Sequence, residues 1–351
     1  MATDYPLAIV IPAYKSAFLR QALDSVASQT CQRFQLYVGD DASPENIGEI
    51  VREYSNVLPI NYRRFEKNLG RASLVKHWER CIRMGNEPWV WLFSDDDAME
   101  ASCVESFFGE LRATEGRHDL YRFNTISINH AGTPLSENPQ HPQNETGADF
   151  LVAHLRGDRK STAQELIFSR AAWASGGGFP DFPLAWASDD AFIAMLGLRK
   201  PIRVIAGPRL KWRSSGQNIT TVNSSPIAAQ KFQACREFVL WTADFLKKTP
   251  PTNSHLVNGE LYRLLENWFF QDMVYRHKLV GFRSSLEVDK LAASSWHRPR
   301  GYGFLKTMKF NCNLIREKLL RKALRFLKPG TMSKIETPSK RIAKSSALSS
   351  Q

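Results

Sequence analysis

Cysteine is scarce in this sequence, and its placement shows no pairing pattern. The five cysteines are scattered, odd in number and without a CxxC pair. Disulfide frameworks and structural zinc sites usually need an even set at short, regular spacings, so we expect neither. Unpaired cysteines instead favour a protein that works in a reducing compartment, which predicts a cytoplasmic location.

Long hydrophobic runs are also missing. No apolar stretch approaches the roughly 18 residues of a membrane-spanning helix. The N-terminus has no basic start, and the apolar run beginning at Leu7 is only five residues long before Pro12. A signal peptide is therefore not expected. Apolar residues still make up 43% of the 351 residues, enough for one large core or two domains.

The first 300 residues carry little net charge, although the whole chain carries +12. Residues 301–351 hold 12 Lys and Arg against 2 Asp and Glu, which leaves 35 basic and 33 acidic residues before them. Because nucleic-acid readers usually have a basic face on the fold itself, a nucleic-acid partner is not expected. The basic excess belongs to the C-terminal tail.

Short apolar runs alternate with helical patterns through the first hundred residues. This alternation predicts an α/β fold with a mostly parallel sheet covered by helices on both faces. Proline, asparagine and glutamine between 129 and 147 indicate a loop. The predicted strands are 7–11, 34–38, 60–63, 89–93 and 163–170, and the predicted helices are 18–29, 45–54, 72–84, 171–175 and several within 226–277.

Carboxylates follow two of these strands. Asp40 and Asp41 close the second strand, and Asp95, Asp96 and Asp97 close the fourth. Since the C-terminal ends of parallel strands share one edge of a sheet, both groups should line the same crevice. Three adjacent carboxylates repel one another unless a cation lies among them, and oxygen ligands suit Mg²⁺ or Mn²⁺. The alternative is an acidic turn or helix N-terminus, where Asp is common.

Another acidic pair, Asp189 and Asp190, begins a helical run that reaches Leu196. One interpretation is that the pair caps this helix and complements its dipole. The other is that one carboxylate acts as a general base, which requires only hydrogen-bond reach of an acceptor hydroxyl. Just upstream, Gly176–Gly178 would permit close backbone approach to a ligand, and Trp186 could face that ligand or pack in the core.

Five motifs stand out in the first hundred residues: Ile9–Tyr14, Ser25–Thr30, Phe34–Ser43, Asn68–Gly70 and Trp91–Asp97. In order and spacing they resemble the nucleotide-sugar-binding half of family 2 glycosyltransferases. The resemblance implies a GT-A (Rossmann-like) domain over 1–225, divided into a nucleotide-sugar half at 1–100 and an acceptor half at 101–225. A helical extension over 226–300 and a tail over 301–351 would follow.

The resemblance also implies roles for single residues. Asp41 would accept a hydrogen bond from the nucleotide base, and Asp40 would support its turn. Asp96 would bind the metal with Asp97 as a further ligand, although Ser94 stands where the family usually has Asp. The other residues implied at the donor are Pro12, Ala13, Tyr14, Asn68, Gly70, Arg71, Asp95 and Arg213.

The resemblance places the acceptor base at Asp190, the second residue of the family's Glu-Asp motif. Asp189 replaces the usual Glu, so the choice between the two stays open. Arg213 could instead be a solvated surface residue. Ser214 and Ser215 stand where many members have a His near the metal. The resemblance therefore implies a metal-dependent, inverting transfer of sugar from a nucleotide-diphosphate donor to a glycan hydroxyl.

The tail predicts a membrane partner. Apolar residues recur every three or four positions between Phe304 and Phe326, with Lys and Arg on the other faces, and Pro329-Gly330 ends the pattern. Such a helix, over 304–328, is typical of binding to an anionic membrane surface; docking on the protein body is the alternative. We expect a peripheral protein at the inner face of the cytoplasmic membrane, acting on lipid-linked glycan for bacterial surface polysaccharide.

Two other functions use similar features. A sugar-phosphate nucleotidyltransferase also has acidic metal sites at strand ends, but a Gly-rich phosphate loop would normally follow its first strand, and Ile11–Lys15 is not one. A non-catalytic nucleotide- or nucleic-acid-binding protein would have to use the basic tail.

Overall fold

A computed structural model of the chain describes residues 6–216, 218–220 and 225–249, together with 261, 264, 265 and 267–269. All of these residues belong to one compact unit. Most of the predicted extension at 226–300 and the whole tail at 301–351 lie outside the described residues, so the predicted membrane helix at 304–328 stays a prediction. In the part that is described, no helix combines the length and apolar character needed to cross a bilayer.

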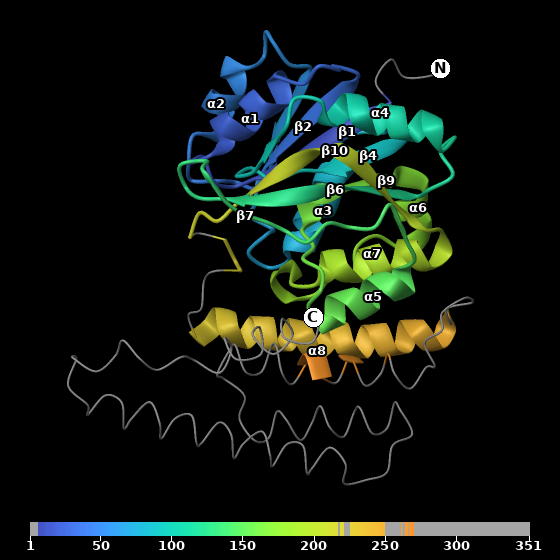
Figure 1. Ribbon diagram of the computed structural model, residues 1–351. Helices are drawn as coiled ribbons and strands as arrows, with labels where there is room; N and C mark the ends of the chain where they lie inside the picture. Colours follow the sequence, from blue (N-terminus) through green and yellow to red (C-terminus); the bar gives the residue numbers. More distant parts are fainter. Residues whose placement is uncertain are drawn as a thin grey trace, which may run out of the picture. The chain divides into compact units, whose positions relative to one another are not determined.

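Within the described residues, ten strands form a single sheet at the centre of the fold (Figure 1). The strands are β1 (Leu7–Ala13), β2 (Phe34–Asp40), β3 (Ile60–Arg64), β4 (Trp89–Leu92), β5 (Ala98–Met99), β6 (Leu120–Ile128), β7 (Pro134–Glu137), β8 (Asn144–Glu145), β9 (Leu166–Ser169) and β10 (Ile202–Arg213). Their order is β3-β2-β1-β4-β9-β6-β10-β5, with β7 on β6 and β8 on β10. The long pairings are parallel, and β9 runs antiparallel between β4 and β6. The predicted α/β fold with a mostly parallel sheet is confirmed.

Helices cover both faces of this sheet (Figure 1). They are α1 (Leu19–Ala27), α2 (Ile47–Glu53), α3 (Leu74–Ile82), α4 (Cys103–Ala113), α5 (Gly147–Arg156), α6 (Arg170–Gly176), α7 (Ser188–Arg199) and α8 (Ser225–Lys248), with the short 3₁₀ helices η1 (Ala163–Glu165) and η2 (Pro183–Ala185). Helices α1, α2 and α4 lie on one face, whereas α3, α6 and α7 lie on the other.

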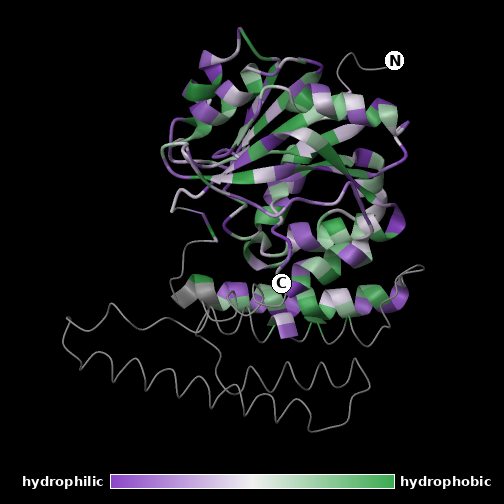
Figure 2. Cartoon of the chain, in the orientation of Figure 1, coloured by the Kyte–Doolittle hydropathy of each residue, from purple (hydrophilic) through white to green (hydrophobic). Residues whose placement is uncertain are grey.

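The hydrophobic core follows from alternation along the strands. Leu7, Ile9 and Ile11 of β1 point to the face where Leu23 of α1 and Phe107 of α4 pack, because successive side chains of a strand point to opposite faces. The intervening residues of β1 are equally buried on the other face. Figure 2 shows hydrophobic residues along the central strands and hydrophilic residues in many of the surrounding loops.

Two central strands did not follow from the sequence pattern. β6 carries Arg122, Asn124 and Thr125 among its apolar residues, and β10 contains a Gly-Pro step with a register shift against β6. The predicted loop at 129–147 contains the short strands β7 and β8. The predicted strand at 163–170 begins as η1 and becomes extended only at Leu166. In each case the partner strand, rather than local periodicity, determines the structure.

Candidate active site

The predicted meeting of the acidic strand ends occurs at one cavity. β1 lies between β2 and β4, parallel to both, and the chain order of the strands reverses there, which is where open α/β sheets bind ligands. A cavity of about 530 Å³ opens at these C-terminal ends. The predicted residues that line it are Pro12, Tyr14, Asp41, Asn68, Gly70, Arg71, Asp95, Asp96 and Asp97.

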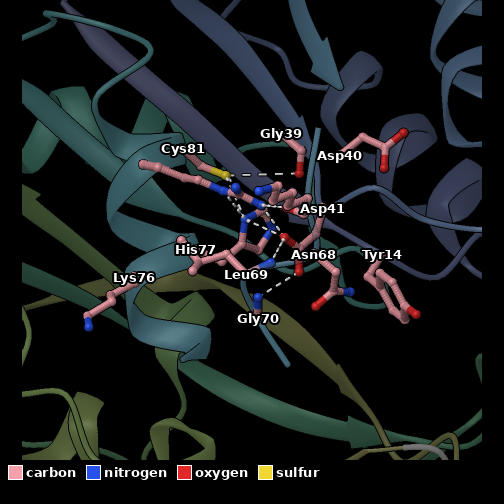
Figure 3. A network of polar contacts seen from close by, with 12 residues as sticks. Tyr14, Gly39, Asp40, Asp41, Asn68, Leu69, Gly70, Lys76, His77 and Cys81 are labelled. Atoms are coloured by element: carbon pink, nitrogen blue, oxygen red, sulfur yellow. Dashed lines mark hydrogen bonds and ion pairs between the residues drawn. The ribbon is translucent and has the colours of Figure 1, made fainter. Parts of the chain in front are cut away.

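Asp41 lines this cavity and is held by several N–H donors (Figure 3). Its side chain accepts hydrogen bonds from the backbone of Leu69 and Gly70, both at 2.8 Å, and from the Arg80 guanidinium. A carboxylate offers about four acceptor positions, so room remains for one more donor. At Gly70 a Cβ atom would lie 2.7 Å from Asp41 Oδ2, so this close approach requires glycine.

His77 also lines the cavity, and the sequence analysis did not single it out. Its Nδ1 lies 3.6 Å from Asp41 Oδ1 and accepts a hydrogen bond from Arg80 Nε at 3.0 Å. Burial lowers the pKa of His77 to about 4, so the ring is neutral near pH 7. Leu74, His77 and Trp78 share one face of α3 and all reach the cavity. A single helical His gives no pattern that separates it from a core residue.

Two predicted donor residues lie behind the cavity wall. Ala13 is fully buried in β1. Asp40 is fully buried as well, and its carboxylate accepts from Tyr62 Oη at 2.7 Å, Arg64 Nη1 at 2.8 Å and the Ser43 backbone at 2.8 Å. Figure 3 shows its carboxylate directed away from the Asp41 network. Asp40 therefore holds the turn that presents Asp41.

The three carboxylates after β4 point to different partners. Asp95 Oδ2 accepts from the backbone N–H groups of Tyr14 and Lys15 at 2.9 and 3.0 Å, which ties the β1–α1 loop to the site. Asp96 Oδ1 accepts from Ser94 Oγ at 2.5 Å. Asp97 is buried, and its Oδ1 accepts from the Arg213 backbone at 2.7 Å.

Crowding of these carboxylates has an electrostatic cost. Burial and the neighbouring Asp96 raise the pKa of Asp95 to about 6. The same two causes raise the pKa of Asp97 well above its ordinary value. A divalent cation among them would offset this repulsion, and carboxylate oxygens are the donor set that Mg²⁺ and Mn²⁺ prefer. The residues thus fit such a cation, although the described side chains do not converge as a preformed group of metal ligands.

Arg213 does not line the cavity. Its guanidinium donates to the Asp96 carbonyl at 2.7 Å, to Gln21 Oε1 at 2.7 Å and to the His130 carbonyl at 2.9 Å. Its Cζ also lies 4.5 Å from the centre of the Phe18 ring. With the residue only 1% exposed, Arg213 braces the acidic turn from behind, and we do not assign it to the diphosphate.

Comparison with known proteins agrees with this geometry. Residues 8–162 match the family model described as glycosyl transferase family 2. This stretch therefore carries a family 2 glycosyltransferase domain. The chain is 27% identical over 130 residues to Glycosyltransferase GlyA of Streptococcus pneumoniae and 34% identical over 122 residues to a Chondroitin synthase of Escherichia coli. These matches cover 37% and 32% of this chain, but only 18% and 17% of the relatives' own lengths.

Solved structures show the same GT-A fold. TarS of Staphylococcus aureus in complex with UDP-GlcNAc aligns with a TM-score of 0.60 and 16% identity, over 82% of this chain and 79% of that one. TarS in complex with UDP aligns with a TM-score of 0.60 and 15% identity, over 90% and 91% of the two chains. The family 2 match over residues 8–162 favours sugar transfer over the nucleotidyltransferase and binding-protein alternatives.

The two carboxylates predicted as candidates for the acceptor base begin α7. Asp189 and Asp190 lie in the first turn, whereas the N-cap is Ala187, which makes no side-chain cap hydrogen bond. Neither carboxylate is among the residues that line the donor cavity, but Leu184 of the preceding η2 is. Asp189 is partly exposed and Asp190 is buried, with Oδ1 of Asp190 lying 3.3 Å from His154 Nδ1 of α5.

The backbone before this pair is unusual. Leu184, Ala185 and Ala187 have φ values of 61°, 52° and 64°, in the left-handed region that residues with a Cβ seldom occupy. Such conformations persist only where the surroundings impose them, and they cluster at functional sites. The sequence gives no sign of this turn, since none of the three residues is glycine.

A buried charge network lies next to Asp190. Arg122 and Glu165 are both fully buried and form an ion pair, and Arg122 Nη1 lies 3.7 Å from Glu145 Oε2. Burial, followed by the charge of Glu165, raises the pKa of Asp190 to about 7. Burial and the charge of Asp190 raise the pKa of Asp189 well above its ordinary value. A carboxyl with a raised pKa is suited to accept a proton at neutral pH.

Proposed function

We propose that this family 2 enzyme is a metal-dependent, inverting glycosyltransferase that moves a sugar from a nucleotide-diphosphate donor to a hydroxyl of a glycan. The observation that carries the proposal is that Asp41 and the triplet Asp95, Asp96 and Asp97 line one and the same cavity. A nucleotide sugar has the matching polarity, with hydrogen-bond donors on its base and negative charge on its diphosphate. The TarS complexes with UDP and UDP-GlcNAc support a uridine nucleotide as the donor.

The cavity residues divide the donor between them. The remaining acceptor position of Asp41 would take the base N–H, while Asn68, Gly70, Pro12 and Tyr14 would border base and ribose. Lys15 and Arg71 add positive charge to the wall, which favours the diphosphate.

Asp96, with Asp97 as a second ligand, would hold Mn²⁺ or Mg²⁺, and Asp95 would fix the neighbouring loop. When bound, the cation acts as a Lewis acid that stabilises the negative charge on the departing nucleoside diphosphate. Asp96 and Asp97 would determine where the cation binds. Hydrogen bonds from Ser94, Asn218 and the Arg213 backbone fix the positions of these two carboxylates.

The α7 carboxylates would supply the base. The acceptor oxygen attacks the anomeric carbon, its proton passes to Asp189 or Asp190, and the bond from that carbon to the diphosphate oxygen breaks. A single displacement of this kind inverts the configuration. Asp189 is the more exposed of the two, whereas Asp190 has the contact with His154. Both carboxyls have a raised pKa.

The acceptor is proposed from the sequence of the tail. A basic amphipathic helix at 304–328 would hold the enzyme on the anionic inner face of the cytoplasmic membrane. Lipid-linked glycans are built at that surface, so we propose such a glycan, destined for surface polysaccharide, as the acceptor.

The donor half of the proposal is tested with Asp96→Ala and a panel of nucleotide sugars assayed with Mn²⁺ or with a chelator. Because a cation at a departing diphosphate is worth several kcal/mol, we expect transfer or donor hydrolysis to fall about 100-fold or more in the variant. Asp158→Asn, an exposed carboxylate elsewhere, is the matched control and should match the unmodified enzyme. Undiminished turnover by Asp96→Ala, or turnover indifferent to the chelator, would contradict a metal held here.

A further inference from the structure

One buried cation lies outside the roles assigned so far. Lys231 of α8 is 0% exposed. Its Nζ lies 4.5 Å from the centre of the Trp186 ring and donates a hydrogen bond to the Thr220 carbonyl at 3.3 Å. Burial lowers the pKa of Lys231. A buried ammonium is costly unless its contacts offset the loss of water. The contacts with Trp186 and Thr220 therefore stabilise Lys231 in its buried position.

The contact with Trp186 connects Lys231 to the turn that precedes the proposed base. Trp186 is flanked by Ala185 and Ala187, both with left-handed backbone. Asp189 and Asp190 follow Ala187 by two and three residues. α8 supports the same turn through Phe182, whose ring meets Phe238 and Trp241 of α8 edge-on. Strained conformations need such external support, and here α8 provides part of it.

The contact with Thr220 connects Lys231 to the segment beside the proposed metal ligands. Thr220 and Asn218 both line the donor cavity. Asn218 Nδ2 donates to Asp96 Oδ2 at 3.1 Å, so the segment held by Lys231 also touches the proposed metal ligand. Lys231 thus contacts both the turn that precedes the α7 carboxylates and the segment that touches the proposed metal ligand Asp96.

We propose that Lys231 is a positioning residue that fixes the α7 carboxylates relative to the donor cavity, so that α8 is an integral part of the transferase although Lys231 itself is buried away from the cavity. The inference rests on the proposed acceptor base. A cation–π contact is stronger when it is shielded from water, and a small displacement of a catalytic group costs much more rate than binding.

The test compares Lys231→Met, which keeps the length of the side chain without its charge, with Lys231→Arg and with Lys247→Met. Lys247 is exposed on the same helix and serves as the matched control. For each protein we would measure the melting temperature, the affinity for UDP with Mn²⁺, and kcat and KM for transfer from the best donor of the panel. We expect Lys231→Met to lower kcat about 10- to 100-fold, with UDP affinity within about twofold and with partial recovery in Lys231→Arg.

Three results would overturn the inference. The first is a kcat of Lys231→Met equal to that of Lys247→Met, and the second is a loss of UDP affinity as large as the loss of kcat. The third is an additive loss of activity when Trp186→Phe is combined with Lys231→Met, because the two residues would then act independently. A structural role alone would lower the melting temperature and leave the kcat of the folded fraction unchanged. Failure of the proposed function is distinct, because the unmodified enzyme would then transfer no sugar from any donor.

Discussion

At Asp190, burial favours the neutral carboxyl while the proposed chemistry needs the ionised form. The residue is 8% exposed, and the groups around it are Asp189, Glu165, Arg122 and His154. Its pKa rises from an ordinary 3.8 to about 7, so folding takes up a proton between these values. The stability that protonated Asp190 provides is therefore present at low pH and lost as the pH rises toward 7.

Replacing Asp190 with Asn should separate stability from activity. We expect Asp190→Asn to be more stable than the unmodified protein by about 1–3 kcal/mol at about pH 8, since one pKa unit is worth about 1.4 kcal/mol. The difference should shrink toward about pH 5, where the carboxyl is protonated in the fold. Denaturant unfolding at several pH values measures it, and transfer should be lost at every pH. A variant that is equally destabilised across the range would show that the carboxylate is not disfavoured by burial.

The sequence was most informative for single residues at strand ends. Asp41 and Asp95–Asp97 were found because residues that follow a short apolar strand of a parallel sheet lie at the edge where such sheets bind ligands. Arg213 and Ala13 lie behind the cavity wall, and sequence order does not say which side of a wall a residue occupies. His77 and Lys231 were missed since their roles depend on contacts with residues far away in the chain.

At the scale of elements, local pattern worked where each strand was followed by its own helix. β1 to β4 and α1 to α3 lie close to their predicted positions. β6 and β10 were not predicted, because their polar residues are satisfied inside the fold, as when Arg122 pairs with Glu165. The turn before α7 was not predictable either, since its left-handed residues include two alanines and a leucine.

That turn gives a prediction about strain. Ala187→Gly should raise the stability of the protein by up to about 1 kcal/mol, because glycine adopts a positive φ without a steric penalty. The same change should lower transfer, since a relaxed turn would hold Asp189 and Asp190 less firmly. Thermal unfolding and kcat measure the two effects.

The control for this prediction is Ala171→Gly. Ala171 is exposed in the helix α6, so glycine there should lower the stability by about 0.5–1 kcal/mol. Opposite signs for the same chemical change would locate the strain at Ala187. Equal losses in both variants would show that the left-handed backbone before α7 carries no strain.

At the scale of the whole molecule, the donor half is the part that comparison and geometry describe together. The family match ends at residue 162, before the α7 carboxylates and before α8. The acceptor half is therefore argued from contacts within this chain, and α8 joins it to the donor cavity through Lys231. The division of the chain at residue 225 stays a prediction, and the contacts of α8 with η2 argue for testing both parts together.

The tail gives the last prediction, and it concerns where the enzyme acts. Full-length protein should float with vesicles that contain an anionic phospholipid, because a basic amphipathic helix combines apolar insertion with about 1 kcal/mol of attraction per basic residue near the surface. A chain ending at residue 300 lacks the 12 basic residues that follow and should stay in solution while still turning over a soluble acceptor. Purely zwitterionic vesicles are the control, and binding to anionic vesicles should weaken in about 1 M salt. If the full-length protein fails to float, or if the shortened chain floats equally well, the tail does not anchor the enzyme and docking on the protein body becomes the better explanation of its apolar face.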